Sequence, residues 1–124
     1  TLLQSAELLD ARGRRPGWVL IDGDRIAATG GAADAPPAAD ATLDLPGRTL
    51  TPGFVDLHCH GGGGASVDEG AAAIATALAL HRAHGTTRAV LSLVAAPLDE
   101  LEASLRTIAE LARDDATVVG AHLE

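Results

Sequence analysis

Two histidines separated by one residue, His58 and His60, follow an apolar run and could bind one metal ion together. The run at 54–60 predicts a β-strand, in which every second side chain points to the same face. Asp56 therefore shares a face with both histidines, although it lies lower in the strand. Imidazole nitrogen is a good ligand for zinc, iron and nickel. The pair alone is a weak signal, so the surrounding pattern decides its meaning.

Four glycines at 61–64 follow the histidines directly. Glycine has no Cβ, so the backbone there can approach a ligand closely, and we expect Gly61 and Gly62 on the substrate side of a site. A phosphate-binding loop is a rival interpretation, because the glycines follow a strand and precede a helix. It fails because a Walker A loop needs a lysine, which the sequence lacks, and because Gly-x-Gly-x-x-Gly matches end on Ser66 or Val67.

The pattern of elements changes near residue 50. Residues 1–50 predict short strands separated by turn residues, at 2–9, 17–21, 25–29, 42–45 and 48–50. Residues 51–124 instead alternate strand and helix, with strands at 54–60, 86–94 and 117–124. Apolar strands separated by helices predict a parallel sheet covered by helices, which is an α/β fold.

The helix predicted at 68–84 has recognisable ends. Asp68 and Glu69 are expected in its first turn, where negative charge suits the helix dipole, and Gly85 is expected to end it. His81 and His84 fall in its last turn, where partial positive charge is favourable. A second helix is predicted to begin at Pro97.

Three segments carry a resemblance to a known family. The stretch Pro-Gly-Phe-Val-Asp-Leu-His-Cys-His at 52–60 resembles the first barrel strand of the metal-dependent amidohydrolase superfamily. His-Gly-Thr-Thr at 84–87 and Gly-Ala-His-Leu-Glu at 120–124 are similar to the N-acetylglucosamine-6-phosphate deacetylase family. The likeness runs through essentially the whole chain but covers only the first third or so of such an enzyme. In that family the last segment continues with Gly-Pro, whereas this chain stops at Glu124.

The resemblance implies a fold. Residues 1–50 would form a small β-sandwich segment, and residues 51–124 the first three β/α units of a (β/α)₈ TIM barrel. Such a barrel takes roughly 250 residues. We therefore expect an N-terminal fragment that is inactive alone and whose unclosed sheet has an apolar edge.

The resemblance also implies a metal site and a reaction. Active sites of these barrels lie at the carboxyl ends of the strands, where His58, His60 and Glu124 are expected. These residues would hold one or two divalent ions, zinc or iron. The catalytic Asp and two further histidines would lie beyond residue 124. The reaction would remove the acetyl group of N-acetylglucosamine 6-phosphate, giving glucosamine 6-phosphate and acetate.

Two titratable residues near the predicted site, His122 and Asp56, each have two possible roles. His122 shares a face with Glu124, and is expected either to orient the site or to be a hydrogen-bonded core histidine. Asp56 is likewise a supporting residue of the site or a hydrogen-bonded core acid. Cys59 points away from the histidines, so we expect a small buried thiol.

The amino-acid composition argues against several classes of binding partner. The net charge of −8 argues against nucleic acid or an anionic membrane surface. The single Cys59 cannot form an internal disulfide, which is typical of the cytoplasm, and no apolar run reaches the ~18 residues of a membrane span. The resemblance implies a small amino-sugar phosphate as substrate and a homodimer for the full-length protein.

Alternative functions stay open. Another amidohydrolase, such as a dihydroorotase or a nucleobase deaminase, shares the His-x-His pattern. Dihydroorotases commonly have an Arg soon after this pattern, where the present chain has glycine. A non-catalytic binding or assembly role for a shortened chain is the third hypothesis.

Overall fold

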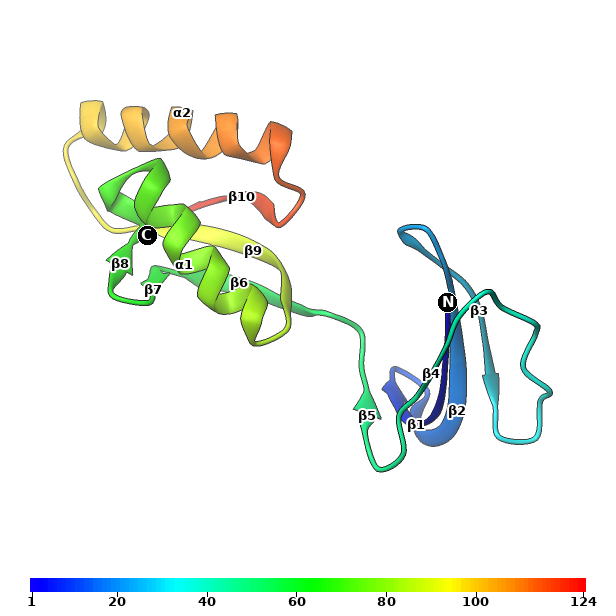
Figure 1. Ribbon diagram of the computed structural model, residues 1–124. Helices are drawn as coiled ribbons and strands as arrows, with labels where there is room; N and C mark the ends of the chain where they lie inside the picture. The colour runs from blue at the N-terminus through cyan, green and yellow to red at the C-terminus, as the bar shows by residue number, and fades with distance from the viewer. The chain divides into compact units, whose positions relative to one another are not determined.

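The computed structural model describes all 124 residues and separates into two compact units, Thr1–Pro52 and Gly53–Glu124 (Figure 1). The first unit is built from strands alone, and the second combines strands with helices. The prediction of a mixed α/β chain is therefore confirmed. None of the helices combines the length and apolar character that crossing a membrane would require.

The first unit is one sheet in which β1 is the common partner. Its order is β3-β2-β1-β4, and β5 also pairs with β1. The first three strands form an antiparallel meander, whereas β4 and β5 run parallel to β1. The strands are β1 (Leu2–Asp10), β2 (Gly13–Asp22), β3 (Arg25–Gly31), β4 (Thr42–Asp44) and β5 (Thr49–Leu50).

A bend at Ser5 lets β1 pair with two strands in succession. Ser5 has a φ of 59°, and the register between β1 and β2 shifts between Leu3 and Ala6. Before the bend β1 pairs with β4, and after it with β5. The Ser5 hydroxyl donates to Asp44 Oδ1 at 2.8 Å, and this hydrogen bond is the main cause of the lowered pKa of that carboxyl. The interpretation of this unit as a β-sandwich segment stays a prediction.

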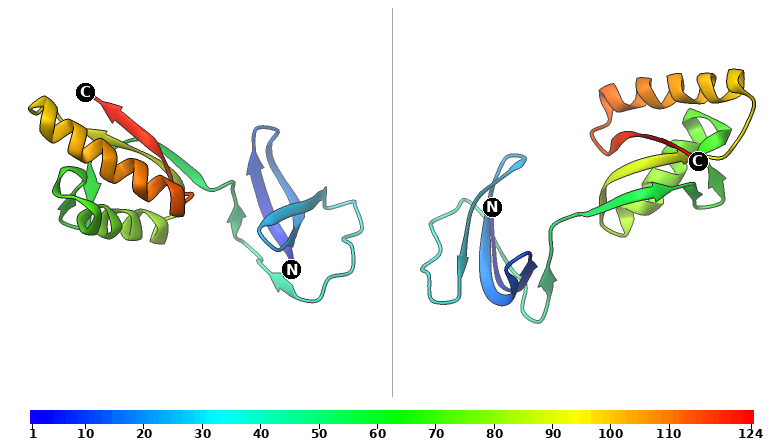
Figure 2. Two further views of the ribbon diagram at one scale, coloured as in Figure 1. Left: turned by 90° about the horizontal axis from the view of Figure 1, so that it is seen from above. Right: turned by 180° about the vertical axis from the view of Figure 1, so that it is seen from behind.

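The second unit is a parallel sheet in the order β10-β9-β6 with two long helices. The helices α1 and α2 lie beside the strands of this sheet (Figure 2). Both helices contribute to one apolar core with the central strand β9. A hairpin and a short 3₁₀ helix connect β6 to α1. The elements are β6 (Phe54–Cys59), β7 (Gly61–Gly62), β8 (Ala65–Ser66), η1 (Val67–Glu69), α1 (Ala71–Ala83), β9 (Thr86–Leu93), α2 (Leu98–Asp114) and β10 (Val118–Leu123).

The core of this unit lies between the sheet and the helices. Leu91 and Leu93 of β9 are fully buried, and Ile74 and Leu78 of α1 and Ile108 of α2 pack with them. The remaining buried members are Cys59, Val67, Ala89 and Val118. Burial of this apolar surface is the main force that positions the ends of the three strands.

The start of the first helix differs from the prediction. Ser66 and Glu69 form a capping box around η1, and Gly70, with a φ of 93°, separates that turn from α1. Asp68 and Glu69 therefore lie in η1 rather than in the first turn of the long helix, because the positive φ of Gly70 interrupts the helical backbone between η1 and α1. The predicted end is confirmed, since Gly85 has a φ of 97° and donates its N–H to the carbonyl of Arg82 at 3.0 Å.

The apolar body of β6 also differs from the prediction. Phe54, Val55 and Leu57 are 57%, 56% and 71% exposed. The reason is that β6 is an edge strand of this sheet, and only Cys59 at its end reaches the core.

An ionic network lies at the opposite end of the sheet from the carboxyl ends of the strands. Arg82, at the end of α1, donates to Asp115 and to the Thr117 hydroxyl, which immediately precede β10. The Arg82 hydrogen bond lowers the pKa of Asp115. This network joins the first helix to the loop that leads into the last strand.

The Leu91→Ala substitution in the protein that carries this chain should lower the free energy of unfolding by about 2–5 kcal/mol, because it leaves a cavity in a fully buried position. Urea unfolding followed by circular dichroism measures the change. The matched control is Leu98→Ala, since Leu98 is 85% exposed and its truncation should change stability by less than about 0.5 kcal/mol. Equal losses for the two variants would contradict the described core.

Candidate metal centre

The alternation of side chains at the end of β6 places the two histidines on one face and the buried cysteine on the other. His58 and His60 share one face, and their Nε2 atoms lie 2.9 Å apart. Cys59, between them, is 3% exposed and belongs to the core on the helix side. The two imidazoles therefore present their nitrogens away from the helices.

The end of the third strand brings a carboxylate to the same place. Glu124 follows β10 directly, and its Oε1 lies 3.4 Å from His58 Nε2 while its Oε2 lies 3.6 Å from His60 Nε2. The backbone N–H of Glu124 donates to the carbonyl of Leu93 at 3.3 Å, which continues the ladder between β9 and β10. The ligand atoms of the three side chains all lie within 4.8 Å of one another.

These separations suit a small divalent cation. Two ligand atoms at bond lengths of about 2.1 Å are about 3.0 Å apart at a right angle and about 3.4 Å apart at a tetrahedral angle. The observed separations between donor atoms, from 2.9 to 3.6 Å, cover this range. Two neutral imidazoles and one carboxylate also form a donor set that zinc accepts. We define the group His58, His60 and Glu124 as the candidate metal centre; its binding of a metal stays a prediction.

His122 lies beside this centre. Asp56 does not share its face as predicted, because the register of β6 shifts between Asp56 and Cys59 and the Asp56 carboxylate lies within 4.8 Å of the ligand atoms of Cys59 and His81. The ring of His122 is 5.0 Å from that of His58, centroid to centroid, and tilted by 52°. Asp56 accepts the backbone N–H of His58 through Oδ1 at 3.1 Å and is half-buried. Asp56 thus contacts the backbone that carries a candidate ligand, whereas His122 lies against a ligand ring.

Gly61 and Gly62 form the first strand of the β7–β8 hairpin. A Cβ on Gly61 would collide with the carbonyl of Ala65 across the hairpin, and a Cβ on Gly62 would lie 2.9 Å from His81 Nε2. Glycine is therefore required at positions 61 and 62 because a larger residue would collide with its neighbours in and beside the hairpin. A place on the substrate side of the site stays a prediction for both residues.

His81 links α1 to this hairpin, and sequence reasoning missed that role. Its Nε2 donates to the carbonyl of Gly61 at 3.0 Å and lies 3.5 Å from the sulfur of Cys59. A second group of potential metal ligands consists of Asp56, Cys59 and His81, whose ligand atoms lie within 4.8 Å of one another. No local signal marks His81, because its partner lies twenty residues earlier in the chain.

Cys59 has the properties of a buried structural thiol. Burial raises the pKa of Cys59, so the thiol is protonated at neutral pH. The expectation of a small buried thiol is confirmed by its 3% exposure.

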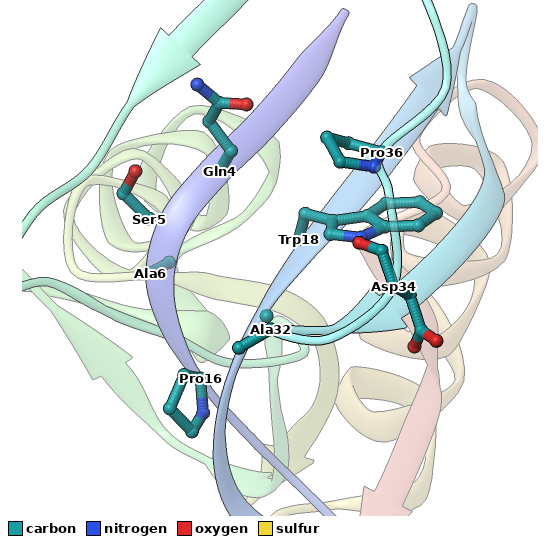
Figure 3. Close-up of a pocket in the computed structure, with 9 residues that line it drawn as sticks. Gln4, Ser5, Ala6, Pro16, Trp18, Ala32, Asp34 and Pro36 are labelled. Atoms are coloured by element: carbon teal, nitrogen blue, oxygen red, sulfur yellow. The ribbon is translucent and has the colours of Figure 1, made fainter.

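A pocket on the first unit contains none of the predicted site residues. Trp18 lies in it beside Pro36 and Asp34 (Figure 3), and its indole N–H donates to the carbonyl of Asp34 at 2.9 Å. The other lining residues come from β1, β2 and the turn after β3: Gln4, Ser5, Ala6, Pro16, Gly17 and Ala32.

No protein-family model matches the chain, but its fold is similar to that of solved amino-sugar-phosphate deacetylases as a class. The similar solved structures include N-acetyl-D-glucosamine-6-phosphate deacetylase from Mycobacterium smegmatis, at 41% identity and a TM-score of 0.80. That match covers 100% of this chain and 35% of the relative. A second structure of the M. smegmatis enzyme, in complex with N-acetyl-D-glucosamine-6-phosphate, has a TM-score of 0.82 over 99% of this chain and 32% of the relative.

Curated proteins give one extended match and several local ones. N-acetylgalactosamine-6-phosphate deacetylase from Escherichia coli O157:H7 is 32% identical over 112 residues, which are 87% of this chain and 29% of the relative. Imidazolonepropionase from Streptomyces griseus is 57% identical over 42 residues, which are 34% of this chain and 10% of the relative.

The extended matches at more than 30% identity described above are thus amino-sugar-phosphate deacetylases, which confirms the resemblance predicted from the sequence. The chain spans about a third or less of the length of these relatives.

Cys59 should react slowly with iodoacetamide in the folded protein, because its thiol is buried and protonated. His81→Ala should raise the alkylation rate several-fold, since it removes the bond to Gly61 and the ring beside the sulfur. Mass spectrometry of timed samples measures the rate. The matched control is His84→Ala, because His84 Nδ1 contacts only its own helix, at the carbonyl of Leu80. Rapid alkylation of the unsubstituted protein would contradict the described packing.

Proposed function

We propose that the protein carrying this chain is a metal-dependent deacetylase that hydrolyses N-acetylglucosamine 6-phosphate to glucosamine 6-phosphate and acetate. The observation that carries the proposal is the convergence of His58, His60 and Glu124 at the carboxyl ends of parallel strands. The extended similarity to amino-sugar-phosphate deacetylases supports the choice of reaction.

The proposal includes an architecture. Residues 51–124 are the first three β/α units of a (β/α)₈ barrel, and residues 1–50 are a β-sandwich segment before it. The parallel order β10-β9-β6 supports the first part, because adjacent barrel strands are parallel and joined by helices. Active sites of such barrels lie at the carboxyl ends of the strands, where the candidate metal centre is found.

Each residue of the candidate metal centre has a chemical role in this proposal. His58 and His60 would offer Nε2 lone pairs, and Glu124 would offer a carboxylate whose negative charge offsets part of the charge of a cation. A bound divalent cation, zinc or iron, supplies Lewis-acid polarisation of an amide carbonyl and makes water more acidic.

The candidate metal centre is accessible to a substrate. The side chains of His58, His60 and Glu124 are 49%, 39% and 50% exposed. Gly61 and Gly62 follow His60 directly and carry no side chains. We assign them to the substrate side, where an N-acetyl group can approach the ligands closely.

Two epimeric sugars occur among the relatives. The M. smegmatis relative was solved with N-acetyl-D-glucosamine-6-phosphate, and the E. coli relative is named for N-acetylgalactosamine 6-phosphate. The higher identity to the former, 41% against 32%, supports the glucosamine compound.

Glu124→Gln in the full-length protein should weaken zinc binding, because a neutral amide is a poor ligand in place of a carboxylate. Competition with a chromogenic chelator measures the affinity, and acetate release measures activity, which should fall together with it. Glu110→Gln is the matched control, since Glu110 is an exposed residue of α2 outside the candidate metal centre. Unchanged zinc affinity in the Glu124 variant would remove this residue from the site.

The full-length protein should release acetate from N-acetylglucosamine 6-phosphate faster than from N-acetylgalactosamine 6-phosphate, and exhaustive chelation should abolish both activities. Added zinc or iron should restore them. Full activity after chelation would refute the metal-dependent mechanism. Hydrolysis of an imidazolone or deamination of a nucleobase, with no acetate release, would instead support another amidohydrolase, as the local match to imidazolonepropionase suggests.

A further inference from the structure

Two buried polar atoms near the candidate metal centre have no hydrogen-bond partner. They are Nδ1 of His60 and the hydroxyl oxygen of Ser92. Buried polar atoms in folded proteins nearly always have a partner, so each such atom calls for an explanation. One explanation can account for both atoms, because the sheet places His60 and Ser92 at neighbouring positions, where they can become partners of each other.

Ser92 points toward the face that carries the candidate metal centre. It lies in β9 between Leu91 and Leu93, whose side chains belong to the core on the helix side. Alternation along the strand therefore turns the Ser92 hydroxyl to the opposite face. Ser92 is fully buried there even though the candidate metal centre on the same face is partly exposed.

The sheet register places Ser92 beside His122 and next to the position that follows Cys59. Ser92 pairs with His122 of β10, and on the other side Leu91 pairs with Cys59 of β6. His60 follows Cys59 as Ser92 follows Leu91, so these two residues occupy neighbouring positions beside the end of β6. Neighbouring residues at matched positions of parallel strands point to the same face.

The ring of His60 needs a partner on the side away from the ligands. Its Nε2 faces His58 and Glu124, which leaves Nδ1 on the other side of the ring. A neutral imidazole that offers a lone pair at Nε2 carries its hydrogen on Nδ1. Histidines that bind metals almost always donate this second N–H to an acceptor, which sets the tautomer and the ring orientation.

We propose that Ser92 is a positioning residue for His60, and this inference rests on the proposed metal-dependent function. His60 Nδ1–H donates to Ser92 Oγ, either after rotation of the Ser92 side chain or through one bridging water. The hydroxyl oxygen is an acceptor with two lone pairs, so it can take this hydrogen bond. The bond holds His60 in the tautomer whose Nε2 binds a cation, and Ser92 itself does not bind the metal.

The test compares zinc affinity across variants of the full-length protein, measured by chelator competition. Ser92→Ala should weaken zinc binding by about 10- to 100-fold, the usual effect of removing such a partner. Ser92→Thr retains a hydroxyl and should restore most of the affinity. Thr117→Ala is the matched control, because it removes another buried hydroxyl, which accepts from Arg82 at the far end of the sheet, and should leave the affinity unchanged.

A spectroscopic measurement tests the same hydrogen bond independently of Ser92→Thr, whose extra methyl group must fit a fully buried position. In the zinc-loaded protein, ¹⁵N-edited NMR should show a protected proton on His60 Nδ1, and Ser92→Ala should abolish that protection. Protection unchanged in Ser92→Ala, or equal zinc affinity in Ser92→Ala and the unsubstituted protein, would overturn the role of Ser92.

His60→Ala distinguishes the two proposals. A large loss of zinc affinity in His60→Ala, combined with no loss in Ser92→Ala, would refute only the positioning role. No loss in His60→Ala would refute the metal site itself, and the inference about Ser92 would fail with it.

Discussion

The alternation of side chains at the end of β6 is the constraint on which the site depends. One face of this strand end holds Cys59 in the apolar core, and the other presents His58 and His60 with their Nε2 atoms 2.9 Å apart. The same alternation in β9 separates core leucines from Ser92. Burial of the apolar residues thus orients the polar ones, since a strand cannot turn one set inward without turning the other outward.

The third strand completes the arrangement through the backbone. Glu124 is held beside the histidines because β10 pairs with β9 along its length, and the ladder continues to the N–H of Glu124. Ligands from separate strands can meet because parallel strands end at a common edge. The geometry of the candidate metal centre is therefore a property of the three-strand sheet, rather than of any single motif.

Sequence reasoning predicted the elements that depend on local pattern. Alternation placed His58 and His60 on one face and Cys59 on the other, and Gly85 correctly marked the end of α1. The features that it missed depend on contacts distant in the chain or on backbone angles. Gly70 interrupts the predicted helix through its positive φ, and the bond of His81 to Gly61 spans twenty residues. No sequence pattern marks Ser92, because the property that distinguishes it, a buried hydroxyl without a hydrogen-bond partner, depends on the folded structure.

The network of Arg82, Asp115 and Thr117 has a consequence for protein engineering. It lies where the strands begin, whereas the candidate metal centre lies where they end. Conservation at the starting face of such sheets concerns stability, and residues at the finishing face concern chemistry. Substitutions around Arg82 can therefore be selected for thermal tolerance in a library that leaves residues 58–64 and 120–124 constant, so that heat resistance is improved without altering the candidate metal centre.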